Sequence, residues 1–154
     1  MTADLLTVPL EEVRKTIERK YRALWTKVFG GHEGLSPAVL DVSPVAGHAG
    51  YRPDHNVLMV GISPYDLSDP AVLVPESDPT WLSDLVHEMV HEYQSKVIAG
   101  DATEEGRALR TRFAPLYPQP GHDETYFSGV PLFADLVGKP IKEFVEWIAP
   151  FPFG

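Results

Sequence analysis

Apolar residues recur at steps of three and four along two long segments of the chain. The first stripe contains Leu10, Val13, Ile17, Tyr21, Leu24 and Val28, which would share one face of a helix. The second segment extends from about Thr80 to Ala99 and has a broader apolar face, so we expect it to form a central helix. Shorter segments predict a helix near residues 103–113 and a last helix that begins at Pro140.

Between the two long segments the pattern changes to short apolar runs separated by turn residues. Residues 38–42, 47–51 and 56–62 are predicted to be strands, and Pro53 to Asn56 has the composition of a turn. Residues 64–79 are rich in Pro, Asp and Ser and are expected to form a loop. The pattern therefore predicts an α+β fold in which a small antiparallel or mixed sheet packs on the central helix, with helices at both ends.

The composition limits the kinds of protein that this chain can be. The chain has 154 residues, of which 44% are hydrophobic, and we expect residues 1–154 to form one domain. The chain has no cysteine, which excludes disulfides and cysteine-based zinc sites. A net charge of −9 argues against nucleic-acid binding. Met1 to Leu6 lack a signal-peptide pattern and no apolar run would span a bilayer, so we expect a cytoplasmic protein without membrane contact.

The central helix carries the sequence His87-Glu88-Met89-Val90-His91. Histidines four residues apart lie on one face of a helix, where both imidazoles can bind one Zn²⁺ ion. Glu88 lies beside the pair and can take a proton from a zinc-activated water as a general base. Two core histidines are the alternative, but burying both without a partner on an apolar face is costly. The motif therefore predicts a catalytic zinc site.

A catalytic zinc ion usually has three protein ligands, so one more is needed. His122 is the first candidate because it follows Gly121 at the start of a new segment. The acidic residues nearby are open alternatives: Glu104, Glu105, Asp123 and Glu124. Histidines in the turn-rich upstream region are expected to be surface residues: His32, His48 and His55.

The order of these features resembles that of the SprT-like zinc metallopeptidases. The resemblance covers the first helix, Gly50-Tyr51, the strand at 56–62, the motif at 87–91, and Gly121-His122 with Tyr126. It implies a zincin-like fold with His87, His91 and His122 as zinc ligands and Glu88 as the catalytic acid and base. Zincins commonly bind substrate along a sheet edge, for which residues 56–62 are the candidate. Because these 154 residues contain no cysteine, we do not expect the function of the cysteine-rich DNA-binding tail that many relatives carry.

The expected function is zinc-dependent hydrolysis of a peptide or protein substrate. Tyr126 is a candidate donor to the oxyanion, with a packing role as its alternative. Asp84 precedes His87 by one turn and would either orient a ligand histidine or face solvent.

Three other kinds of protein are alternatives to a SprT-like peptidase. A peptide deformylase would need a cysteine ligand, which the chain lacks. A regulatory metallopeptidase that cleaves repressors would share the motif and differ only in substrate. The alternative from another class is an inactive or structural zinc-binding module that mediates protein interactions. Asp123 or Glu124 would then supply a fourth ligand.

Overall fold

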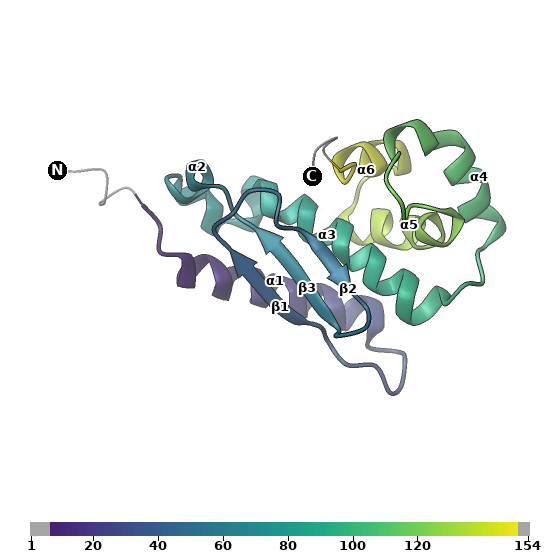
Figure 1. Cartoon of the computed structure of the whole chain (residues 1–154), viewed down its shortest axis with the longest axis horizontal. Coiled ribbons are helices and arrows are strands. Elements are labelled where there is room, and N and C mark those ends of the chain that lie inside the picture. Colours follow the sequence, from purple (N-terminus) through teal and green to yellow (C-terminus); the bar gives the residue numbers. More distant parts are fainter. Residues whose placement is uncertain (1–6, 151–154) are drawn as a thin grey trace. The chain divides into compact units, whose positions relative to one another are not determined.

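The computed structural model describes residues 7–150 (Figure 1). Residues 1–6, on which the signal-peptide prediction depends, lie outside the described residues. The described chain forms six α-helices and a three-stranded mixed sheet, which confirms the α+β class. Its contacts divide it into two compact units that meet in the sequence between Leu85 and Val86.

Helix α1, Leu10–Phe29, lies against the sheet in the first unit. The apolar stripe expected from the sequence is buried from Val13 to Val28, whereas Leu10 is half-buried. Glu11 and Glu12 in the first turn suit the positive end of the helix dipole. The Tyr21 hydroxyl accepts a hydrogen bond from the backbone nitrogen of Ala38 at 2.7 Å. This bond holds α1 to the chain that enters the first strand, so the long helix covers one face of the sheet.

The sheet consists of β1 (Val39–Ser43), β2 (Gly50–Arg52) and β3 (Val57–Gly61) in the order β1-β3-β2. A turn at Pro53–Asn56 joins β2 to β3 as an antiparallel hairpin, as the turn residues predicted. Strand β3 then fills the space between β2 and β1, where it runs parallel to β1.

The central place of β3 corrects the prediction that residues 56–62 form a free edge. Both sides of this strand are already paired, with β1 in one direction and β2 in the other. The apolar run of β3 is typical of such a position, since Leu58, Val60 and the following Ile62 are all fully buried. The free edges of the described sheet are therefore β1 and β2.

Residues 64–79 form short helical turns, where the sequence predicted a loop. They are α2 (Pro64–Leu67) and the 3₁₀ turns η2 (Pro70–Leu73) and η3 (Pro75–Ser77). Each begins with a proline, whose fixed φ angle suits the first position of a helix. Trp81 donates a hydrogen bond from Nε1 to the Val72 carbonyl at 2.8 Å, so this segment is fixed to the start of the next helix.

Helix α3, Thr80–Tyr93, continues as a π-helical segment η4, Gln94–Ile98. The long helix expected over residues 80–99 is therefore confirmed in extent, with a wider last turn. Ala99 and Gly100 both have positive φ angles, of 50° and 99°, and end the helix as the glycine predicted. The π turns of proteins are uncommon and often lie at functional sites.

The second unit continues after α3 with three further helices. They are α4 (Glu104–Phe113), α5 (Glu124–Val137) and α6 (Ile141–Trp147), and a 3₁₀ turn, η5 (Ala114–Leu116), follows α4. The short helix and the last helix predicted from the sequence are thus confirmed. Gly129 of α5 lies so close to α3 that a Cβ atom there would be 3.0 Å from Tyr93 Cδ1. Its missing side chain lets the two helix backbones approach.

Membrane insertion through a helix finds no support within residues 7–150. None of the helices there combines the length and the apolar character that crossing a bilayer would need.

Candidate metal centre

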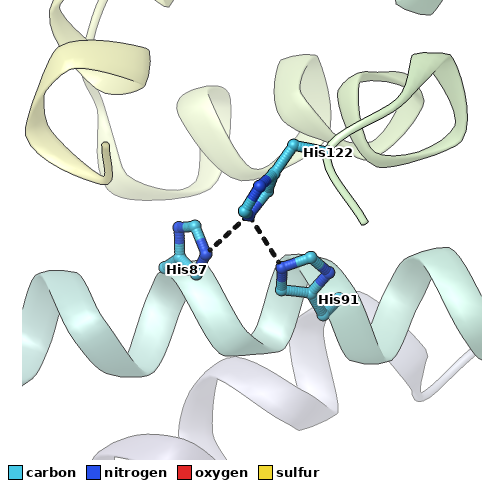
Figure 2. A group of neighbouring side chains, drawn as sticks. All are labelled: His87, His91 and His122. Atoms are coloured by element: carbon cyan, nitrogen blue, oxygen red, sulfur yellow. Dashed lines mark hydrogen bonds between the residues drawn. The ribbon is translucent and has the colours of Figure 1, made fainter. Parts of the chain in front are cut away.

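Three histidine side chains meet in the second unit (Figure 2). His87 and His91 extend from adjacent turns of α3, and His122 comes from the segment before α5. His122 Nε2 lies 3.2 Å from His87 Nε2 and 3.1 Å from His91 Nε2. Nitrogen ligands at 2.0–2.1 Å from a tetrahedral zinc ion lie about 3.3–3.4 Å from each other. The two separations from His122 Nε2 are therefore close to those of zinc ligands, and ligand atoms of all three histidines lie within 4.8 Å of one another.

The partners of the other ring nitrogens determine where the hydrogens lie. His87 Nδ1 is 2.7 Å from the Ile148 carbonyl oxygen, and His122 Nδ1 is 3.1 Å from that of Gln119. A carbonyl oxygen can only accept, so Nδ1 carries the hydrogen and Nε2 keeps a free lone pair.

Gln94 assigns the hydrogen of His91 in the same way. Its Oε1 atom lies 2.8 Å from His91 Nδ1. Its Nε2 atom lies 3.2 Å from the Gly121 carbonyl oxygen and 2.7 Å from Thr125 Oγ1. Because the Gly121 oxygen only accepts, the amide NH₂ faces Gly121 and the amide oxygen faces His91. His91 Nδ1 is therefore also the donor.

The short contacts among the Nε2 atoms, drawn as dashed lines in Figure 2, are then not ordinary hydrogen bonds. None of the three atoms has a hydrogen to donate, and three lone pairs point into the same space. A bound cation can accept all three lone pairs at once, whereas the neutral histidines cannot satisfy one another's lone pairs.

The electrostatic surroundings keep these rings neutral. Burial, together with the neighbouring His91 and His122, lowers the pKa of His87 to about 3. Burial also lowers the pKa of His91 to about 4, and it lowers the pKa of His122. Neutral imidazole is the form that binds a metal ion. The site is therefore ready for a metal at neutral pH, and its residues fit zinc in number, type and spacing.

Glu88 lies within the same buried region without being one of the three clustered residues. Its side chain belongs to the buried polar groups of the protein, with 7% of the residue exposed. The pKa of Tyr126 is raised by burial, by Tyr117 and by the charge of Glu88. The carboxylate is thus near the aromatic ring that contacts all three histidines.

The segment that presents His122 depends on a glycine and a helix cap. Gly121 has a φ angle of +91°, which favours glycine over any other residue. Asp123 accepts hydrogen bonds at Oδ1 from the Thr125 nitrogen at 2.9 Å and from the Tyr126 nitrogen at 3.4 Å. It is therefore the N-cap of α5. His122 is held between the glycine turn and this cap.

The other candidates for the third ligand lie elsewhere in the described chain. Glu124 is 3.9 Å from Arg110 in an exposed ion pair, and Glu104 and Glu105 form the acidic first turn of α4. Among residues 7–150, the group that could hold a metal contains three histidines and no carboxylate. Of the upstream histidines, His32 and His55 are exposed, and His48 pairs with Asp41.

Tyr126 and Asp84 differ in how closely they approach the histidines. The Tyr126 hydroxyl lies 3.1 Å from His87 Nδ1, across the ring from the nitrogen that faces the cluster. The residue is fully buried, so its position fits a packing role better than contact with an oxyanion. Among residues 7–150, the three Nδ1 atoms have the Ile148 and Gln119 carbonyls, the Gln94 amide and the Tyr126 hydroxyl as hydrogen-bond partners, and not Asp84. Burial and the charge of Asp66 raise the pKa of Asp84 to about 6.

Sequence reasoning missed three groups that support the site. Gln94 holds His91, the Ile148 carbonyl holds His87, and the Tyr117 ring lies parallel to that of His87 at 6.4 Å. Gln94 had a weak signal, because a residue three positions after His91 lies on nearly the same helix face. A backbone carbonyl 61 residues away from His87 leaves no signal in the sequence.

Comparison of this chain with protein-family models, with curated proteins and with solved structures finds no match.

Proposed function

We propose that this protein is a zinc-dependent peptidase that hydrolyses peptide bonds with Glu88 as the general base. The proposal is carried by one observation, the convergence of three unprotonated Nε2 atoms of His87, His91 and His122 beside a buried glutamate. Catalytic zinc sites have three protein ligands and an open position, whereas structural sites are closed by a fourth. Asp123, the nearest acid in sequence to His122, is used as a helix cap.

In this proposal each residue has a separate task. The three histidines hold the metal through Nε2, and their Nδ1 hydrogens keep the rings in orientation. Zinc, when bound, supplies Lewis acidity toward the substrate carbonyl and lowers the pKa of a water in the open position. The Glu88 carboxylate accepts a proton from the attacking water and returns it to the departing amide nitrogen.

A zincin-like fold and a SprT-like affiliation belong to the same proposal. They are supported by the helix that carries His87, Glu88 and His91 and by the later Gly121-His122 segment. The substrate is proposed to be a peptide or protein, and the net charge of −9 argues against a nucleic acid.

Metal content is the first test. The wild type, His122→Ala and the matched control His32→Ala would be purified without chelator, loaded with zinc and analysed by mass spectrometry. His32 is an exposed histidine, so its loss should leave the metal in place. We expect one zinc ion per chain in the wild type and in His32→Ala, and a large loss in His122→Ala. A wild type that holds no zinc would refute the site.

Activity is tested with a proteome-derived peptide library, in which new termini are identified by mass spectrometry. General acid–base catalysis contributes about 10²–10⁴-fold, so Glu88→Gln should lose that much rate while it keeps its zinc. Glu146→Gln, at an exposed position of α6, is the matched control and should retain the wild-type rate. A zinc-loaded wild type that cleaves nothing would favour the structural zinc-binding module instead.

A further inference from the structure

Gln94 connects the two segments of the chain that carry the histidines. It is three residues after His91, at the first position of the π-helical segment η4. Its amide oxygen faces His91 Nδ1 at 2.8 Å. Its amide nitrogen reaches toward the segment of His122, where it meets the Gly121 carbonyl at 3.2 Å and Asp123 Oδ1 at 3.3 Å.

The contacts of Gln94 enclose His122 from both sides in the sequence. Gly121 directly precedes this histidine and Asp123 directly follows it. The shortest contact, 2.7 Å, is to Thr125 Oγ1 in the first turn of α5, and Thr125 in turn donates from this hydroxyl to Asp123. One side chain therefore fixes the orientation of one ligand and the backbone position of another.

Both ends of the Gln94 amide are used by these contacts. An amide has two hydrogens and one acceptor oxygen, and here the oxygen serves His91 while the hydrogens serve the His122 segment. A shorter amide, an acid or a base at this position could not serve both sides. The backbone gives a separate observation, because the π turn that begins at Gln94 departs from a regular helix.

We propose that Gln94 is a positioning residue that assembles the metal centre by coupling His91 to His122. This inference rests on the proposed metal site, but it concerns how tightly the metal is held and not the reaction. Partners that orient metal ligands typically contribute about 10- to 100-fold to metal affinity when they are removed. Gln94→Met, which keeps the length and removes both polar ends, should weaken zinc binding by about that factor.

Gln94 thus forms a bridge between His91 and the His122 segment, and two further variants test the two ends of this bridge separately. Gln94→Glu keeps an acceptor for His91 but loses the donors and places a second carboxylate near Asp123. Thr125→Val removes the shortest contact of the Gln94 amide nitrogen without changing the contact to His91. Thr125→Ser is the matched variant that keeps the hydroxyl. If the bridge acts as a unit, Gln94→Glu and Thr125→Val should each weaken binding, and Thr125→Ser should bind as the wild type does.

The experiment measures zinc affinity by competition with a chromophoric chelator, together with the visible spectrum of the Co²⁺-substituted protein. Ser95→Ala, an exposed neighbour in the same π turn, is the control. Circular dichroism of the metal-free variants checks that they fold. In a double-mutant cycle, the variant with both Gln94→Met and Thr125→Val should lose less zinc affinity than the product of the two single fold-losses.

The outcomes distinguish this inference from the proposed function. Wild-type zinc affinity and an unchanged cobalt spectrum in folded Gln94→Met would overturn the positioning role and leave the three-histidine site intact. Fully independent effects in the cycle would overturn the coupling. A wild type that binds neither metal would overturn both proposals.

Discussion

Asp84 offers a test of the electrostatics around α3 that needs no substrate. The side chain is half-buried in the first unit, one turn before His87. Burial raises the pKa of Asp84 from 3.8 to about 6, and the nearby carboxylate of Asp66 raises it in the same direction. The folded protein therefore holds a proton on Asp84 more tightly than the unfolded chain does.

The sign of the effect on stability follows from this difference. Between pH about 4 and about 6 the folded state binds the proton and the unfolded state does not, so stability falls as pH rises through this window. A pKa change from 3.8 to about 6 corresponds to about 3 kcal/mol above pH 6. Solvent on the exposed side of the carboxylate reduces this to about 2 kcal/mol.

Asn resembles the protonated acid, so Asp84→Asn should remove the penalty. We expect the variant to be about 2 kcal/mol more stable than the wild type at pH 8, and about equally stable at pH 4. For a chain of 154 residues the difference at pH 8 corresponds to a rise in Tm of about 4–8 °C. Urea unfolding across this pH range, in EDTA so that no metal contributes, measures both values.

An exposed aspartate provides the control for the general effect of charge. The chain has a net charge of −9, so removal of any carboxylate relieves some repulsion. Asp101→Asn, at an exposed position, measures that contribution alone. If Asp84→Asn is destabilising at pH 8, or if its effect does not change with pH, the carboxylate is engaged in a favourable contact and the reasoning from burial fails. Weaker zinc binding in the same variant would favour an orienting role instead.

Two further predictions concern the second unit and the metal that we propose it binds. Tyr117→Phe leaves the Val145 carbonyl without its 2.6 Å hydrogen bond and should cost about 1–3 kcal/mol in urea unfolding, with zinc retained because the ring remains; an unchanged stability would contradict it. Zinc at about 100 times its Kd should raise the free energy of unfolding by about 2.7 kcal/mol, and EDTA should reverse the gain. The corresponding thermal shift should be absent in His122→Ala, and an equal shift there would mean that the metal binds elsewhere.

Features that depend on local spacing could be predicted from the sequence. The stripe from Leu10 to Val28 and the long helix at residues 80–99 follow from helical periodicity, and both are present. The pair His87 and His91 follows from the same spacing, because a helix fixes which residues share a face. The hairpin at Pro53–Asn56 follows from turn chemistry.

Features that depend on pairing between distant segments could not be predicted in this way. An apolar run such as Leu58 to Ile62 indicates a buried strand but does not say which strands lie on either side. The central place of β3 is decided by where β1 lies, and the connection over residues 44–49 does not encode it. For the same reason the prolines of residues 64–79 predicted a loop, although each of them opens a helical turn.

The third histidine shows where the limit lies between the two kinds of feature. His122 is 31 residues from His91, so no periodicity relates them, and only the glycine before it marked the segment as unusual. Its approach to α3 requires the positive φ of Gly121 and the close packing at Gly129, neither of which identifies a partner by itself. The positions of the Nδ1 hydrogens are even harder to predict from the sequence, since two backbone carbonyls and the amide of Gln94 determine them. A motif therefore identifies candidate ligands on one helix, but the arrangement of lone pairs that could hold a metal ion arises only when the chain has folded.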